Sequence, residues 1–92
     1  MKKLDDLRAK LDEIDAEILN LLVKRFEKIK LIGEEKKEKN IPILQKSREE
    51  VVMNRAKKVA LKNGIDPAYF EKVYEVIIGG AKDLEYTIVD GR

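Results

Sequence analysis

Positively charged side chains stand at positions where the apolar pattern of this sequence calls for hydrophobic residues. Leucine and isoleucine recur every three or four residues near the start of the chain, a spacing that places them on one face of a helix: Leu4, Leu7, Leu11, Ile14, Ile18 and Leu21. The next position in this row is Arg25, while Arg8 and Lys36 belong to a second row beside it. A charge turned toward an apolar interior is costly unless an anion meets it. These cations therefore predict a site for a negatively charged ligand.

The arginines of the chain are placed differently from its lysines. Arg48 and Arg55 fall within the apolar stripe of a second expected helix, which is formed by Leu44, Val51, Val52 and Val59. Only Arg92, at the end of the chain, is expected at the surface. A guanidinium group can bind a carboxylate through two parallel hydrogen bonds, which an ammonium group cannot do. For Arg55 we prefer a structural role, such as pairing with an acid of the same fold.

Four inward-facing cations remain, namely Arg8, Arg25, Lys36 and Arg48. The inward-facing acids, chiefly Glu49 and Glu85, are too few to neutralise them. We therefore expect a pocket for a small dianion or dicarboxylate.

Three helices must position these residues. The first is expected over residues 4–39, where Asn40 and Pro42 should end it, and the second over residues 44–62, where Asn63-Gly64 should end it. The third is expected from Pro67, after the N-cap Asp66. A helix of about 35 residues is roughly 50 Å long, whereas a compact chain of this size has a radius of gyration of about 12 Å. Part of the first helix must then pack on another molecule, most simply a two-fold partner. We expect an all-α fold, with one long and two shorter helices in an intertwined homodimer, formed by a single domain over residues 1–92.

Distances along the first helix constrain the site. Arg8 and Arg25 are 17 positions apart in the sequence, hence about 25 Å along the helix, and cannot hold the same small ligand within one chain. If Arg8 joins the site, it must come from the partner subunit. Arg25 and Lys36 are about 16 Å apart by the same rule, so their long side chains can converge on a ligand between them.

Composition excludes several kinds of function. The net charge is only +2, and basic and acidic residues are interleaved, which argues against nucleic-acid binding. The sequence contains no cysteine and no histidine, so thiol chemistry and the commonest transition-metal ligand are absent. No apolar run approaches the length of a membrane span, and the N-terminus lacks an apolar signal core. We expect a cytoplasmic protein that uses no metal and does not bind membranes.

Several short motifs, taken together and in order, resemble the chorismate mutases of the all-helical (AroQ) class. The resemblance covers essentially the whole chain. It rests on Leu7-Arg8, Leu21-Leu22 with Arg25, Gly33 with Lys36, Pro42, Ser47-Arg48-Glu49, and Ile77-Ile78 with Ala81.

The resemblance implies an isomerase that rearranges chorismate to prephenate, on the shikimate-pathway route to phenylalanine and tyrosine. Such enzymes need no metal, cofactor or covalent nucleophile. They hold the substrate in a near-attack shape and stabilise charge that develops on the ether oxygen. Carried over to this chain, Arg25 and the partner subunit's Arg8 would clamp the two carboxylates, and Lys36 would reach a carboxylate and the ether oxygen. Glu49 would accept a hydrogen bond from the ring hydroxyl, and Arg48 would line the same wall.

Three positions depart from the best-known form of the pattern. Gln45 stands where an aspartate is common near the ring hydroxyl, and Ala81 replaces a serine that helps to bind a carboxylate. Glu85 occupies the position of a glutamine that donates to the ether oxygen, and glutamate occurs there in other members. A carboxyl group can donate only when it is protonated. We therefore expect Glu85 to work as a neutral acid, with activity falling as the pH rises above neutrality.

Two alternative functions remain open at this point. An isochorismate-pyruvate lyase would use the same scaffold and cationic pocket with a different substrate. A non-catalytic helical module for dimerisation or regulation would instead bind a partner enzyme of aromatic synthesis. The module predicts that Arg25→Lys leaves function intact, whereas a bidentate clamp predicts a large loss.

Overall fold

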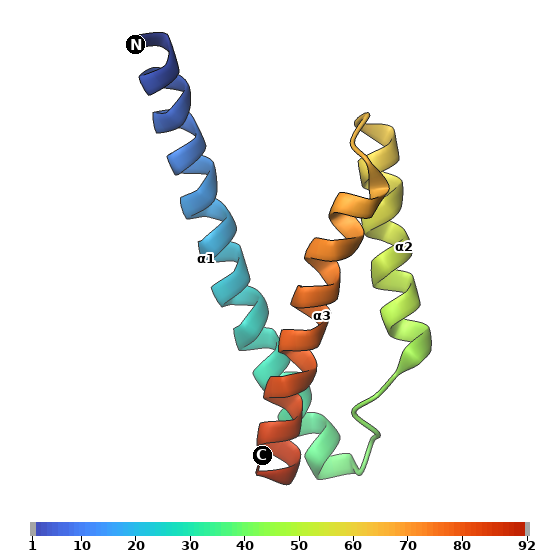
Figure 1. Ribbon diagram of the computed structural model, residues 1–92. Helices are drawn as coiled ribbons and strands as arrows, with labels where there is room; N and C mark the ends of the chain where they lie inside the picture. Colours follow the sequence, from blue (N-terminus) through green and yellow to red (C-terminus); the bar gives the residue numbers. More distant parts are fainter. Residues whose placement is uncertain (1, 92) are drawn as a thin grey trace.

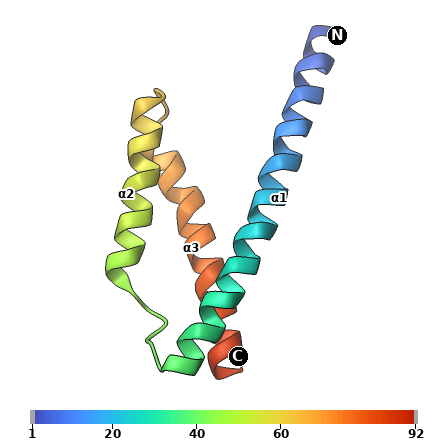
Figure 2. The same ribbon diagram turned by 180° about the vertical axis from the view of Figure 1, so that it is seen from behind.

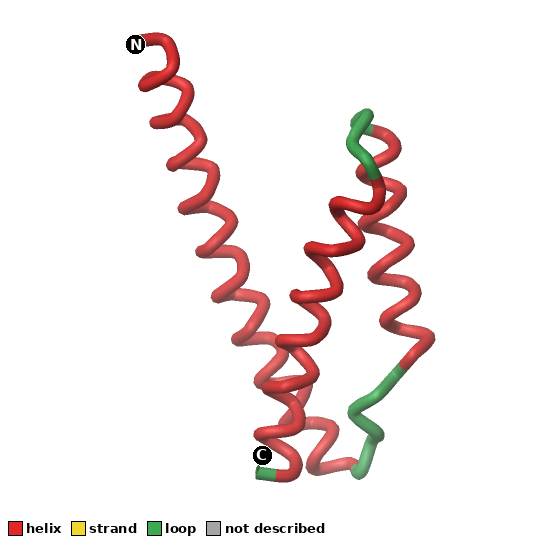
Figure 3. Tube along the Cα trace, in the orientation of Figure 1, coloured by secondary structure: helices red, strands yellow, loops and turns green. Residues whose placement is uncertain are grey.

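The chain is almost entirely helical. The computed structural model describes residues 2–91, and these form α1 (Lys2–Lys39), α2 (Lys46–Lys62) and α3 (Pro67–Asp90), without a strand in that range (Figures 1 and 3). The expected all-α class, with one long and two shorter helices, is confirmed. The helix expected from residue 44 begins two residues later, at Lys46. Arg92, expected at the surface, lies outside the described residues.

The end of α1 is set by a turn that its sequence encodes. Asn40 takes a left-handed backbone conformation with φ +56°, which asparagine tolerates better than most residues. The N–H of Ile41 donates to the carbonyl oxygen of Lys36 at 2.9 Å, which is the long bond of a Schellman motif. Pro42 follows and prevents the helix from resuming. The expected stop at Asn40 and Pro42 is confirmed.

The junction between α2 and α3 also follows the expected signals. Gly64 has φ +68°, and the N–H of Ile65 donates to the carbonyl oxygen of Ala60 at 2.9 Å, so α2 ends in a second Schellman motif. The side chain of Asp66 then accepts a hydrogen bond from the N–H of Ala68 at 2.9 Å, with Pro67 in the first turn of α3.

Helix α3 is the central element of the fold. Both α1 and α2 pack on α3, and across residues 2–91 they do not pack on each other. Figures 1 and 2 show α2 beside the first half of α3, whereas α1 meets the last part of α3 and its N-terminal half stands away from the other helices. The radius of gyration is 16.6 Å and the molecule measures 56 × 24 × 16 Å. This is well above the 12 Å or so of a compact chain of this length.

Small residues make the closest helix contacts. Ala56 and Ala60 are the buried residues of α2, and Ala81 is buried in α3. Of the expected α2 stripe, Val52 is half-buried in the single chain, whereas Val51 and Val59 are 50% and 47% exposed. A helix packs closely through a row of small side chains, and the alanines, one turn apart, form that row.

The apolar row of the N-terminal half of α1 is exposed in the single chain. Its six members are between 42% and 61% exposed: Leu4, Leu7, Leu11, Ile14, Ile18 and Leu21. A continuous exposed apolar face on a protein of this size indicates an interaction surface. No helix among the described residues combines the length and the apolar character needed to span a membrane.

Candidate active site

A cavity of about 280 Å³ lies where the C-terminal half of α1, the following loop, α2 and α3 come together. Its apolar lining includes Ile29, Ile32, Val52 and Ile78. Its polar lining combines four cations, two carboxylates and an amide: Arg25, Lys36, Arg48, Lys82, Glu49, Glu85 and Gln45. The volume suits a small molecule rather than a polymer.

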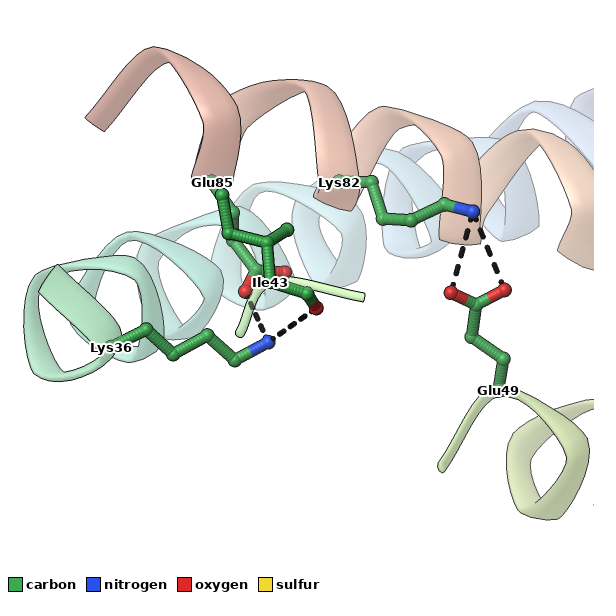
Figure 4. A network of polar contacts seen from close by, with 5 residues as sticks. All are labelled: Lys36, Ile43, Glu49, Lys82 and Glu85. Atoms are coloured by element: carbon green, nitrogen blue, oxygen red, sulfur yellow. Dashed lines mark hydrogen bonds and ion pairs between the residues drawn. The ribbon is translucent and has the colours of Figure 1, made fainter. Parts of the chain in front are cut away.

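One ion pair lies at the end of the cavity nearest to the loop that follows α1. Lys36 Nζ lies 2.6 Å from Glu85 Oε1 and donates a hydrogen bond to the carbonyl oxygen of Ile43 at 2.9 Å (Figure 4). Glu85 is only 5% exposed, although no hydrogen-bond donor is well directed at its Oε1, so the contact with Lys36 is an ionic one. Attraction between charges is stronger where water is excluded, and this pair therefore holds Lys36 in place.

A second ion pair crosses the cavity between α2 and α3. Lys82 Nζ lies 3.4 Å from Glu49 Oε1 and 3.3 Å from Glu49 Oε2, so the ammonium faces both carboxylate oxygens (Figure 4). Both side chains are about one-third exposed, at 32% and 29%. Sequence reasoning missed Lys82. The available signal was its place directly after Ala81 and three residues before Glu85 on the same helix.

The two arginines of the cavity have no acidic partner among residues 2–91. Neither Arg25 nor Arg48 forms an ion pair with any carboxylate of the described chain, and Arg25 is half-buried while Arg48 is exposed. Both cavity carboxylates are already paired with lysines. With all six charged groups ionised, the cavity carries a net charge of +2, which complements a dianion.

This arrangement can bind and polarise a ligand but offers little for other chemistry. The described residues contain no group of three or more acidic, cysteine or histidine side chains that could hold a metal ion. The cavity instead provides positive charge and hydrogen-bond donors from α1, α2 and α3, together with apolar side chains. Such a site favours orientation and electrostatic stabilisation of a small anion.

Comparison with known proteins agrees with this geometry. The sequence profile of the family described as chorismate mutase type II matches residues 7–86. The chain belongs to this family. The expected resemblance is thereby confirmed, and the matched range contains Arg8 as well as all the charged groups of the cavity.

Three relatives of this chorismate mutase type II sequence carry two different names. A chorismate mutase of Methanocaldococcus jannaschii is 32% identical over 85 residues, which cover 92% of this chain and 86% of that protein. A 4-amino-4-deoxychorismate mutase of Streptomyces pristinaespiralis is 39% identical over 89% of this chain and 64% of its own length. Another protein of that name, from Streptomyces venezuelae, is 32% identical over 83% of this chain and 74% of its own length.

Most of the residues expected in the site of a chorismate mutase of this type reach the cavity. Gln45 precedes α2 and makes no capping hydrogen bond with its side chain, which lines the cavity instead. Ala81 also lines the wall, and its methyl group cannot donate the hydrogen bond that a serine would. The structure thus brings together seven expected residues, namely Arg25, Lys36, Gln45, Arg48, Glu49, Ala81 and Glu85. Their roles toward a substrate stay predictions.

Two further arginines lie outside this cavity. Arg8 is exposed on the N-terminal half of α1, about 25 Å along the helix from Arg25. Arg55 lines an adjoining cavity of about 280 Å³, together with Arg25 and Arg48. No carboxylate of the described chain pairs with Arg55, so the structural pairing preferred for it is not found here.

Proposed function

We propose that this protein is a chorismate mutase that converts chorismate to prephenate in aromatic amino-acid biosynthesis. Family membership supports the reaction. The observation that carries the proposal is the charge of the cavity, because Arg25 and Arg48 have no acidic partner among residues 2–91 while both carboxylates are paired with lysines. Chorismate brings two carboxylates, and the unpaired guanidinium groups give the cavity the positive charge that such a dianion needs.

The proposed mechanism uses positioning and electrostatics alone. Arg25 and the partner subunit's Arg8 hold the two carboxylates so that the substrate stays in its folded, reactive shape. Lys36, already fixed by Glu85 and the carbonyl oxygen of Ile43, donates to a carboxylate and to the ether oxygen as negative charge develops there. Glu49 accepts a hydrogen bond from the ring hydroxyl, and Gln45 and Arg48 line the same wall.

Glu85 has a double role in this proposal. In the free site it pairs with Lys36 at 2.6 Å, and an entering carboxylate competes for that lysine. When Glu85 carries a proton, it can donate to the ether oxygen. An amide can always donate from its nitrogen, so we expect Glu85→Gln to retain activity, whereas Glu85→Ala, which has no donor, should lose it. Equal activities of Glu85→Gln and Glu85→Ala would remove the donor role.

A two-fold dimer completes the proposed site. The exposed apolar row of α1 needs a partner surface, and a second copy supplies one with the same pattern. In that arrangement α1 of one subunit brings Arg8 to the cavity of the other. Light scattering coupled to size-exclusion chromatography checks the dimer, since a monomer at micromolar concentration contradicts it. We also place the enzyme in the cytoplasm as part of this proposal.

The decisive experiment is to add chorismate to the purified protein and measure prephenate. We expect prephenate to form well above the uncatalysed rate, without added metal or cofactor. Isochorismate in a parallel assay tests the lyase, which would release pyruvate. A correctly folded protein that converts neither compound would support the non-catalytic module and overturn the proposed function.

A further inference from the structure

The substituent on the substrate ring is not decided by sequence similarity. Relatives named for chorismate and for 4-amino-4-deoxychorismate are 32% and 39% identical to this chain, respectively. The two compounds differ in one group, a hydroxyl against an amine. An aliphatic amine carries a positive charge at neutral pH, as the lysine side chain does, whereas a hydroxyl is neutral. A site that discriminates between the two compounds must therefore respond to the charge of this ring substituent.

The pair between Glu49 and Lys82 is the part of the cavity best suited to do this. Glu49 comes from α2 and Lys82 from α3, and the ammonium faces both oxygens of the carboxylate, at 3.3 and 3.4 Å. Figure 4 shows that the two side chains extend toward each other across the cavity, away from the pair between Lys36 and Glu85. The charge of Glu49 is thus already matched before any ligand arrives.

A hydroxyl and an ammonium meet this pair differently. A carboxylate has about four lone-pair sites, so Glu49 can accept a hydrogen bond from a neutral hydroxyl while Lys82 stays in place. An incoming ammonium group must compete with Lys82 for the same oxygens and is repelled by it. Like charges brought together at a binding site are an effective means of rejecting the wrong ligand.

The charge of the whole cavity leads to the same conclusion. Lys82 is one of four cations that line the cavity beside two carboxylates. Removing it lowers the positive charge of the site by one, which favours a substrate that carries an additional ammonium group.

We propose that Lys82 is a positioning residue that, through Glu49, selects substrates with a hydroxyl group over those with an amino group on the ring. The inference rests on the proposed function, in which Glu49 reads the ring substituent. It assigns to Lys82 a role that is separate from holding the carboxylates or the ether oxygen.

The test compares kcat/KM for chorismate and for 4-amino-4-deoxychorismate in wild type, Lys82→Met and Lys82→Arg. We expect wild type to prefer chorismate. In Lys82→Met the ratio should move toward the amino compound by about tenfold, the equivalent of about 1.4 kcal/mol. Lys82→Arg keeps the charge beside Glu49 and should retain the wild-type preference.

The matched control is a second lysine–glutamate pair between the same two helices. Lys57 Nζ on α2 lies 3.7 Å from Glu71 Oε2 on α3, and neither residue lines the cavity. Lys57→Met should leave the ratio for the two substrates unchanged. Because pairs with this degree of exposure contribute little to stability, both methionine variants should fold, and circular dichroism checks this. If Lys82→Met were unfolded, Lys82→Gln would take its place.

The outcomes separate the two proposals. An unchanged ratio in Lys82→Met, or an equal loss of activity on both compounds, overturns the role of Lys82 while the mutase function stands. A wild type that converts neither compound overturns the proposed function itself, and the selectivity inference with it.

Discussion

The two halves of α1 carry the same apolar pattern but meet different surroundings. In the C-terminal half, Ile29 is half-buried and Gly33 is buried where the helix packs on α3. In the N-terminal half, the apolar row is about half exposed, with Leu11 at 55% and Ile14 at 51%. The C-terminal half packs in part on α3, although Ile32 is still 45% exposed, and the N-terminal half presents its face outward.

The polar residues of the two halves differ in the same way. The C-terminal half interrupts its apolar face with Arg25 and Lys36, and both line the cavity. The N-terminal half has an unbroken row of leucine and isoleucine, with Arg8 beside it. Charged interruptions therefore mark where a ligand is expected, and the unbroken row marks where a protein partner is expected. The following variants test this division, in order of decreasing effect.

Removing Arg25 should have the largest effect. For Arg25→Ala we expect kcat/KM for chorismate to fall by about 10²- to 10³-fold, the range found when a preorganised electrostatic group is lost. Arg25→Lys should recover only part of this loss, because an ammonium cannot bind a carboxylate in the bidentate way. The neighbouring Lys24 is exposed and does not line the cavity, so Lys24→Ala is the control and should retain wild-type activity. Steady-state kinetics decide between these outcomes.

A charge introduced into the N-terminal apolar row of α1 should lower activity by weakening the dimer. Leu11→Asp places an acid in the exposed apolar face, where a partner helix would have to bury it, and this is costly. We expect analytical ultracentrifugation to show weakened dimerisation and activity to fall with it. Lys10→Asp introduces the same acid one position away, off the apolar row, and should leave the dimer intact. A dimer that survives Leu11→Asp would contradict the proposed interface.

Mixing two inactive variants tests whether the N-terminal half of α1 of one subunit reaches the active site of the other. Arg8→Ala and Arg25→Ala each damage both sites of a homodimer, but a mixed dimer regains one intact site if Arg8 acts in trans. After unfolding and refolding an equal mixture, about a quarter of the wild-type sites should be intact, because half of the dimers are mixed. No recovery of activity over the separate variants would place Arg8 outside the site of the partner subunit.

The smallest effects are expected on the free energy of unfolding. They compare Gly33, which lies against another helix, with Gly79, which has free space where a side chain would be. A Cβ at Gly33 would lie 3.0 Å from Ile88 Cδ1, so the contact between α1 and α3 must shift. We expect Gly33→Ala to lower the free energy of unfolding by about 1–2 kcal/mol, as for overpacking. Gly79 has no atom within 4 Å of an added Cβ, so Gly79→Ala should raise the free energy by up to about 1 kcal/mol. Urea unfolding at one fixed protein concentration measures both.

Much of the fold could be predicted because its signals are local. Pro67 after Asp66, Gly64 after Asn63, and Asn40 before Pro42 all act through the conformation of a few residues, and each helix end lies where they indicate. Burial on α2 was harder to predict. Whether Val51 or Ala56 faces α3 depends on how closely two helices approach, and that is decided by the whole fold.

The candidate site shows the same limit. Arg25 could be recognised because it breaks an apolar row, and the motif around Arg48 added Glu49. Lys82 was missed because its acidic partner Glu49 is 33 residues away in the sequence, so only the fold brings the two side chains together. The extent of the domain over residues 1–92 and the roles of the site residues stay predictions.

Lys36 joins the end of α1 to the loop in two ways. Its carbonyl oxygen receives the N–H of Ile41, and its Nζ donates to the carbonyl oxygen of Ile43. The turn that ends α1 therefore also fixes the position of the Lys36 ammonium group in the cavity. Shortening this side chain would free the loop as well as delete a charge, so a loss of rate in Lys36→Ala would combine two effects. A variant at Pro42 that loosens the turn while keeping the lysine would measure the first of them separately.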